Sequence, residues 1–151
     1  MDRTDRALLA ALQADSSRSV AELSERVHLS PSACHRRIKA LEEQGVIAGY
    51  VARLDARKIG LPAEVMVEIT LNSQSSEAME RFERAVCDFD DILECNLMSG
   101  GADYQLRVAA AGLDHYERIH RDCLSRLPGV SSMKTSFSLR RVKRFAGYSV
   151  P

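Results

Sequence analysis

The chain has 151 residues, of which 45% are hydrophobic and 28% charged, and its 21 Lys and Arg are balanced by 21 Asp and Glu. This composition is typical of a folded globular protein and excludes a disordered or fibrous chain. There is no apolar run of the roughly 18 residues that a membrane span needs, and the polar N-terminus does not form a secretion signal. The zero net charge argues against a diffusely basic nucleic-acid binder.

Three short helices are predicted in the first 45 residues. An apolar stripe marks the first over residues 5–14, and Ser19 with Glu22 forms a capping box at the start of the second. Ser30 and Pro31 provide an N-cap and a first-turn proline for the third helix, which we expect to reach Glu43.

The stretch that follows the third helix, residues 46–54, is rich in β-formers, and we predict a β ribbon there. Three helices, the last two joined by a tight turn, followed by a ribbon predict a winged helix-turn-helix over residues 1–50.

The third predicted helix has the charge pattern of a DNA-reading helix. Residues 30–41 include no acidic side chain, whereas Cys34, Ile38 and Leu41 form its buried stripe. Arginine can bind guanine with two hydrogen bonds, and serine or a helix N-terminus can bind phosphate. We therefore predict that double-stranded DNA is contacted by Ser30, Ser32, His35, Arg36, Arg37 and Lys39.

The second half of the chain alternates between strand and helix patterns. Apolar and polar residues alternate from Ala63, which predicts a strand with one buried face. The patterns then predict a helix over 77–89 and a strand over 93–97 that buries Leu93, Cys95 and Leu97. A hairpin turn at 99–102 leads to a strand over 104–108. A helix capped by Asp114 and a strand over 133–139 complete the pattern.

This βαββαβ order is that of a ferredoxin-like domain, and the whole chain is predicted to be α+β. We place a β linker at 51–61 and the ferredoxin-like domain at 62–151. Two helices would cover one face of its sheet. The other face is solvated or pairs with a second subunit, and it carries Glu68, Asn96, Arg107, Lys134 and Ser136.

No metal, cofactor or enzymatic activity is predicted. Cys34, Cys87, Cys95 and Cys123 form no C-x-x-C pair, so we expect reduced thiols in a cytoplasmic protein. His120 and Cys123 stand three residues apart, but two ligands do not close a zinc site. Glycine-rich phosphate loops and catalytic triads are also missing from the sequence.

Three blocks of sequence carry a resemblance to a known family. Residues 29–47 read LSPSACHRRIKALEEQGVI, residues 94–108 contain a G-x-x-D-Y motif at 100–104, and Leu-Pro-Gly-Val at 127–130 precedes the last strand. In this order and spacing, the chain resembles the Lrp/AsnC family, the feast/famine transcription regulators, over nearly its whole length.

The resemblance implies a DNA-binding transcription regulator whose oligomeric state or DNA affinity responds to a small effector, usually an L-amino acid. Family members form homodimers through the linker and the open sheet face, and the dimers assemble into tetramers or octamers that hold the effector between them. Carried over to this chain, the effector-binding candidates are Leu97, Ser99, Gly100, Gly101, Asp103 and Tyr104, with Ser136, Phe137 and Ser138 opposite.

Physical chemistry is compatible with these candidates. Hairpin glycines would expose backbone amides to the carboxylate of an amino acid, and the Asp103 carboxylate would accept hydrogen bonds from its α-ammonium. The alternative is that Gly100, Gly101 and Asp103 form only a tight turn. Gly101 and Ala102 stand where family members often have larger residues, which leaves the identity of the effector open.

Two alternatives to a transcription regulator are an enzyme and a scaffold. Sirohaem decarboxylases resemble this family, but here His115 and His120 fall in a predicted helix rather than in the hairpin. A scaffold with a silent helix-turn-helix is the second alternative. The basic residues near the C-terminus are either a solvated strand end or additional phosphate contacts, and these residues are Lys134, Arg140, Arg141, Lys143 and Arg144.

Overall fold

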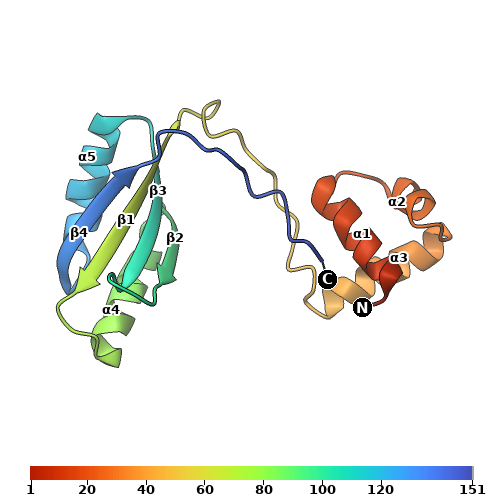
Figure 1. Cartoon of the computed structure of the whole chain (residues 1–151), viewed down its shortest axis with the longest axis horizontal. Helices are drawn as coiled ribbons and strands as arrows, with labels where there is room; N and C mark the ends of the chain where they lie inside the picture. Colours follow the sequence, from red (N-terminus) through yellow and green to blue (C-terminus); the bar gives the residue numbers. More distant parts are fainter. Residues whose placement is uncertain (151) are drawn as a thin grey trace. The chain divides into compact units, whose positions relative to one another are not determined.

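The computed structural model describes residues 1–150, which divide into two compact units. The first consists of residues 1–53 together with 142–150, and the second of residues 54–141. Three helices make up most of the first unit, and the second contains a four-stranded sheet with two helices (Figure 1).

The three helices of the first unit begin at side-chain caps. In α1 (Arg3–Ala14) the Asp2 carboxylate accepts a hydrogen bond from the Asp5 amide at 2.8 Å, and in α2 (Val20–Arg26) Ser19 has the same role in the predicted capping box. Ser30 caps α3 (Pro31–Glu43), whose bounds match the prediction. The helices share a core that contains Leu8, Ala11, Leu23, Cys34 and Ile38.

A tight turn joins α2 to α3. The Leu29 amide donates to the Ser24 carbonyl at 3.0 Å, and His28 between them has a φ of 54°. This is a Schellman motif, in which a left-handed residue lets the chain turn back and satisfy the last carbonyls of the helix. The arrangement of α2, turn and α3 confirms the predicted helix-turn-helix.

The β ribbon predicted at 46–54 is absent from the part of the chain that the structure describes. Residues 44–62 contain no strand, and Val51 is 83% exposed. The β linker predicted at 51–61 is wrong for the same reason: residues 55–61 form turns, closed by a bond from the Leu61 amide to the Ala56 carbonyl. High β propensity is not sufficient for a strand, because a strand needs a paired neighbour.

The last residues of the chain belong to the helical unit. The Tyr148 amide donates to Gln13 Oε1 at 2.6 Å, and Gln13 Nε2 donates to the Tyr148 carbonyl at 3.0 Å. Gly147 has a φ of 121° and lies against the Gln13 side chain. We predicted that the ferredoxin-like domain would include residues 142–151, but this segment as far as residue 150 is bound instead to α1 and grouped with it.

The second unit has the predicted βαββαβ order. Its elements are β1 (Ala63–Leu71), α4 (Ser76–Cys87), β2 (Ile92–Leu97), β3 (Tyr104–Ala110), α5 (Leu113–Asp122), a 3-10 turn (Leu124–Arg126) and β4 (Val130–Phe137). The strands lie in the order β2-β3-β1-β4, and every neighbouring pair is antiparallel. Both helices cover the same face of the sheet (Figure 1).

Strand β1 shows the predicted alternation. Val65, Val67 and Ile69 are fully buried, and they belong to the core that contains Phe82 of α4 and Ile119 of α5. Burying one aliphatic side chain of this size contributes about 1.5–3 kcal/mol. The intervening residues of β1 lie on the open face of the sheet, where the candidate site is built.

The predicted buried face of β2 is only partly correct. Cys95 is half-buried, but Leu93 and Leu97 are 48% and 60% exposed. The pairing of β2 with β3 shifts between Ile92 and Glu94, so Ile92 rather than Leu93 packs against the core. Such irregularities are common in edge strands and cannot be read from alternation alone.

The contact between Gln13 and Tyr148 predicts a local change in stability. In Gln13→Ala, the amides of residues 145–150 should exchange with solvent several-fold faster than in the wild type, because both hydrogen bonds to the segment are lost. Hydrogen–deuterium exchange measures this directly. Gln44→Ala, at an exposed position after α3, is the matched control and should leave the exchange of the segment unchanged.

Candidate functional sites

The solvent-facing side of α3 carries most of the predicted DNA-binding residues. Ser32, His35, Arg36 and Lys39 are exposed, while Cys34, Ile38 and Leu41 of the same helix are buried as predicted. The Lys39 ammonium lies 3.8 Å from the Glu43 carboxylate, a loose exposed pair that leaves the cation available. This face therefore presents cations and hydroxyl groups to solvent.

Ser30 has a local structural role at the start of α3. Its hydroxyl accepts a hydrogen bond from the Ala33 amide at 3.3 Å and lies 3.2 Å from the Ser32 hydroxyl. The cap satisfies one of the free amides of the first turn. Other amides of that turn stay available to a ligand such as a phosphate.

Arg37 points away from this face and towards α1. One guanidinium nitrogen lies 2.7 Å from the Asp2 carboxylate and 2.8 Å from that of Asp5, and the side chain is 35% exposed. The Asp5 amide and the Arg37 guanidinium together hold the pKa of Asp2 below its ordinary value. These ion pairs connect α3 to the start of α1. Arg37 was predicted to contact DNA together with Arg36 because the two are adjacent and basic in the sequence.

A cavity of about 530 Å³ opens beside the β2–β3 hairpin, on the open face of the sheet. In the strand register, Glu68 of β1 lies directly opposite Lys134 of β4 on one side and Gln105 of β3 on the other. The Glu68 carboxylate is 3.7 Å from the Lys134 ammonium. The cavity is lined by Glu68, Thr70, Met98, Ser99, Gly100, Gly101, Ala102, Gln105, Ser132, Met133 and Lys134.

Three of the nine predicted effector residues, Ser99, Gly100 and Gly101, line this cavity. Glu68 and Lys134 were predicted to lie on the open face of the sheet but not to belong to the effector site. The predicted fold places the two residues on neighbouring strands. Whether they face each other depends on the strand register, which the sequence does not give.

Asp103 lies at the hairpin but faces β1. Its Oδ2 accepts a hydrogen bond from the Leu71 amide at 2.7 Å, and its Oδ1 accepts one from the Gln74 side chain at 2.7 Å. Its own amide donates to the Ile69 carbonyl at 2.9 Å. The carboxylate therefore joins the hairpin to the end of β1.

Tyr104 and Phe137 lie on the helix side of the sheet. Tyr104 is buried, stacks on Phe82 with ring centroids 4.6 Å apart, and donates a hydrogen bond to Glu83 at 2.7 Å. Desolvation is the main cause that raises the pKa of Tyr104. Phe137 packs edge-on against Tyr116 at 5.2 Å. Both rings are therefore on the other side of the sheet from the cavity.

The remaining predicted effector residues lie outside the cavity lining. Leu97 is exposed at the end of edge strand β2. Ser136 pairs with Met66 on the open face, and the Ser138 amide donates to the Glu64 carbonyl at 2.9 Å.

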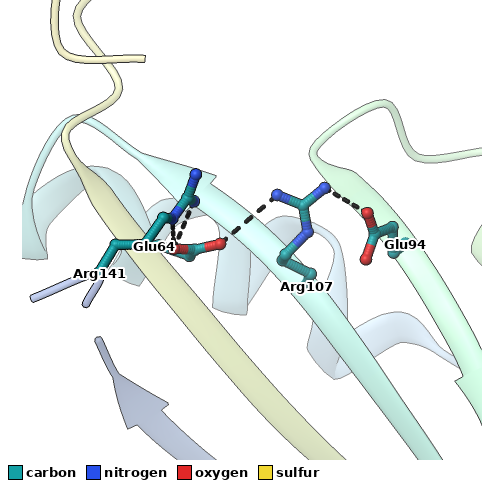
Figure 2. A network of polar contacts seen from close by, with 4 residues as sticks. All are labelled: Glu64, Glu94, Arg107 and Arg141. Atoms are coloured by element: carbon teal, nitrogen blue, oxygen red, sulfur yellow. Dashed lines mark hydrogen bonds and ion pairs between the residues drawn. The ribbon is translucent and has the colours of Figure 1, made fainter. Parts of the chain in front are cut away.

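A separate chain of ion pairs crosses the open face near the start of β1 (Figure 2). Arg141 lies 2.6 Å from the Glu64 carboxylate, which is 3.5 Å from Arg107, and Arg107 in turn is paired with Glu94. The hydrogen bond from Arg141 is the main cause that lowers the pKa of Glu64. These charges satisfy one another and link β1 and β3 to the chain beyond β4.

The described residues include no group of three His, Cys, Asp or Glu side chains arranged to hold a metal ion. Within residues 1–150, no helix is both long and apolar enough to cross a membrane.

Two models of known protein families match this chain. Residues 1–42 match the model of the AsnC-type helix-turn-helix domain, and residues 64–147 match that of the Lrp/AsnC ligand binding domain. The chain belongs to the Lrp/AsnC family. It is accordingly a transcriptional regulator, with a helix-turn-helix domain followed by a ligand-binding domain, as the resemblance implied.

Relatives within the Lrp/AsnC family match most of the chain. The leucine-responsive regulatory protein of Escherichia coli K12 is 40% identical over 144 residues, which cover 95% of this chain and 88% of that protein. An uncharacterized HTH-type transcriptional regulator of Sinorhizobium fredii is 48% identical over 116 residues, covering 77% of this chain and 91% of the relative.

Solved structures of Lrp/AsnC regulators have the same fold. A transcriptional regulator of Neisseria meningitidis in complex with L-methionine is 31% identical, with a TM-score of 0.92 and coverage of 100% of this chain and 96% of the other. An AsnC family regulator from Agrobacterium tumefaciens is 35% identical, with a TM-score of 0.93 and coverage of 98% and 96%.

The pairing of Arg37 with Asp2 predicts a pH-dependent stability. Because the pKa of Asp2 is lowered in the folded state, the ionised pair stabilises the protein at neutral pH, and this contribution disappears as the pH falls through that pKa. Arg37→Gln should therefore unfold at a lower temperature than the wild type at pH 7, and the difference should narrow as the pH falls below 3.8, the ordinary pKa of an aspartate. Circular dichroism at several pH values measures this.

The control for this variant is Arg121→Gln, which removes a 2.8 Å pair with Glu117 on the surface of α5. It should change the melting temperature little at any pH. An equal effect of both substitutions would contradict a structural role of Arg37.

The position of Asp103 predicts a loss of stability on its removal. Asp103→Ala leaves the Leu71 amide without its partner and should lower the free energy of unfolding by about 1–3 kcal/mol. Urea denaturation measures the change. Asp90→Ala, at an exposed position before β2, should stay close to the wild type, and an equally stable Asp103→Ala variant would contradict this role.

Proposed function

We propose that this Lrp/AsnC regulator binds double-stranded DNA with the exposed face of α3, and that an L-amino acid bound in the cavity beside the β2–β3 hairpin modulates this binding. The observation that carries the DNA half of the proposal is the cation-bearing face of α3. The cavity and the ligand-binding domain match support the effector half.

The distribution of side chains on α3 suits entry into the major groove. Arg36 is exposed beside His35, and Lys39 follows one turn later on the same side. A guanidinium can donate two hydrogen bonds to guanine, while the serine-rich first turn can bind a phosphate. Arg37, which is held by Asp2 and Asp5, contributes to DNA binding through the position of α3 rather than by contact.

An amino-acid effector is supported by relatives as well as by the cavity. One relative is named for its response to leucine, and one structural neighbour is a complex with L-methionine. The cavity volume of about 530 Å³ is within the range of small-molecule sites. We propose that the chain works without a further cofactor.

The regulator is proposed to act as a cytoplasmic homodimer that assembles into tetramers or octamers. Several apolar side chains of the linker and C-terminal segment are highly exposed, among them Val51 at 83%, Leu54 at 68% and Val142 at 85%. We propose that a second copy of the chain covers these exposed side chains. The effector would favour one arrangement of subunits and so set the spacing of the two recognition helices.

The proposed division between Arg36 and Arg37 gives a DNA-binding prediction. Arg36→Ala should weaken binding to the promoter DNA of the protein's own gene by about tenfold, because a charged contact is lost. The slope of the logarithm of the binding constant against the logarithm of the salt concentration should become shallower by about one. Electrophoretic mobility shifts over a salt series measure both. The control is Arg118→Ala, at an exposed position on α5.

The proposal is contradicted if the wild type does not shift the DNA at low salt, with or without amino acids. It is also contradicted if Arg36→Ala binds the DNA as tightly as Arg118→Ala.

A further inference from the structure

The last residues of the chain add positive charge to the unit that contains α3. Residues 1–53 hold 8 Lys and Arg against 7 Asp and Glu, a net charge of +1. Residues 142–151 hold Lys143 and Arg144 and no acidic side chain, so the unit as a whole has a net charge of +3. Most of the net positive charge of this unit therefore comes from the C-terminal segment.

The C-terminal segment, residues 142–150, is held in place within this unit. Gln13 of α1 forms two hydrogen bonds with the Tyr148 backbone, at 2.6 and 3.0 Å. The Arg53 guanidinium donates a hydrogen bond to the Phe145 carbonyl at 3.4 Å. Lys143 and Arg144 directly precede Phe145, so their backbone is attached to the helix-turn-helix unit rather than free in solution.

The segment lies beside the stretch where the β ribbon was predicted. Tyr148 and Val150 line a cavity of about 450 Å³ together with Tyr50 and Val51, which follow α3 in the chain. A helix that reads bases needs phosphate contacts beside it, because these fix its register and orientation on the duplex. Residues 44–62 form no ribbon that could supply such contacts, whereas the neighbouring segment carries cations.

Lys143 and Arg144 are available to an anion. Both are exposed, and among residues 1–150 neither has a carboxylate within 4.0 Å, whereas Arg141 is paired with Glu64 at 2.6 Å. The second copy proposed above covers apolar side chains such as Val142. Long cationic side chains at the edge of an apolar contact keep their charged ends in water, because burying an unpaired charge is costly. The two cations therefore stay accessible in the homodimer.

We propose that the C-terminal segment is a second DNA contact of the helix-turn-helix unit, in which Lys143 and Arg144 bind backbone phosphates beside the base pairs that α3 reads. This inference rests on the proposed function of α3. A guanidinium binds phosphate through two hydrogen bonds, and an ammonium binds it as a point charge. Because phosphates are the same at every base pair, the segment contributes affinity without sequence preference.

Removal of both charges from the full-length protein tests the contact. In Lys143→Gln/Arg144→Gln, the slope of the logarithm of the binding constant against the logarithm of the salt concentration should become shallower by about two. Binding should weaken by about tenfold, and equally for the promoter DNA of the protein's own gene and for an unrelated duplex of the same length. Electrophoretic mobility shifts with both duplexes over a salt series measure this.

Two control variants separate the charge of the segment from charge in general. Lys143→Arg/Arg144→Lys keeps both charges and should bind like the wild type. Arg118→Gln/Arg126→Gln removes two exposed cations of the ligand-binding unit and should also bind like the wild type. Circular dichroism verifies the fold of every variant, and sedimentation velocity verifies that each keeps the oligomeric state of the wild type.

The position of the segment can be tested without changing any charge. Gln13→Ala loses both hydrogen bonds to Tyr148 and should weaken binding to both duplexes several-fold, because a released segment has to be ordered again on binding. Gln44→Ala is the control. Equal binding by these two variants would overturn the role of α1 in positioning the cations.

Failure of this contact can be told apart from failure of the proposed function. If Arg36→Ala weakens binding but Lys143→Gln/Arg144→Gln keeps the affinity and salt slope of the wild type, the segment contact is overturned while the function of α3 stands. A loss of affinity that is confined to the promoter DNA, or that accompanies a changed oligomeric state, overturns it as well. If the wild type binds no DNA, the proposed function fails, and the segment contact fails with it.

Discussion

The register of β1 between β3 and β4 is the constraint on which the ligand-binding unit depends. Alternate residues of β1 either fill the core under α4 and α5 or lie on the open face. A shift of one residue would exchange the two sets. Asp103 fixes one end of this register by hydrogen bonds to both Ile69 and Leu71, and the Arg141–Glu64 pair joins the other end to the chain beyond β4.

The same register creates the cavity. Glu68 has to face away from the helices for its carboxylate to lie beside Lys134 and Gln105. The hydrophobic alternation that stabilises the sheet therefore also positions the polar groups of the site. The hairpin then closes one side of the cavity, because Asp103 holds it against the end of β1.

Much of this fold could be predicted from the sequence because its signals are local. Caps at Ser19 and Ser30, the alternation in β1 and the helical spacing of α4 depend on residues only a few positions apart. The ribbon at 46–54 could not be judged in that way. Its β-prone residues have no neighbouring strand in the part of the chain described here, and strand formation depends on a partner.

The functional sites were harder to predict for a related reason. Asp103 and Tyr104 carry the family motif, but tertiary contacts direct one to the β1 backbone and the other into the core. Neighbouring Arg36 and Arg37 look equivalent in sequence, yet successive helical residues point about 100° apart. One therefore faces solvent and the other faces Asp2 and Asp5. Adjacent residues of the same charge can thus have different roles when only one has an acidic neighbour across the fold.

The zero net charge takes on a different meaning once the chain is divided into its two units. Residues 1–53 and 142–151 hold 10 Lys and Arg against 7 Asp and Glu, a net charge of +3, whereas residues 54–141 hold 11 against 14, a net charge of −3. Lys143 and Arg144 contribute to the positive unit because Gln13 binds the segment that carries them. Within that unit, Asp2 and Asp5 neutralise Arg37 at the start of α1, while Arg36 is exposed on α3 and Lys39 has only a loose pair with Glu43. A neutral chain can therefore present a localised cationic helix to DNA while its ligand-binding unit has the opposite charge and does not compete for phosphate.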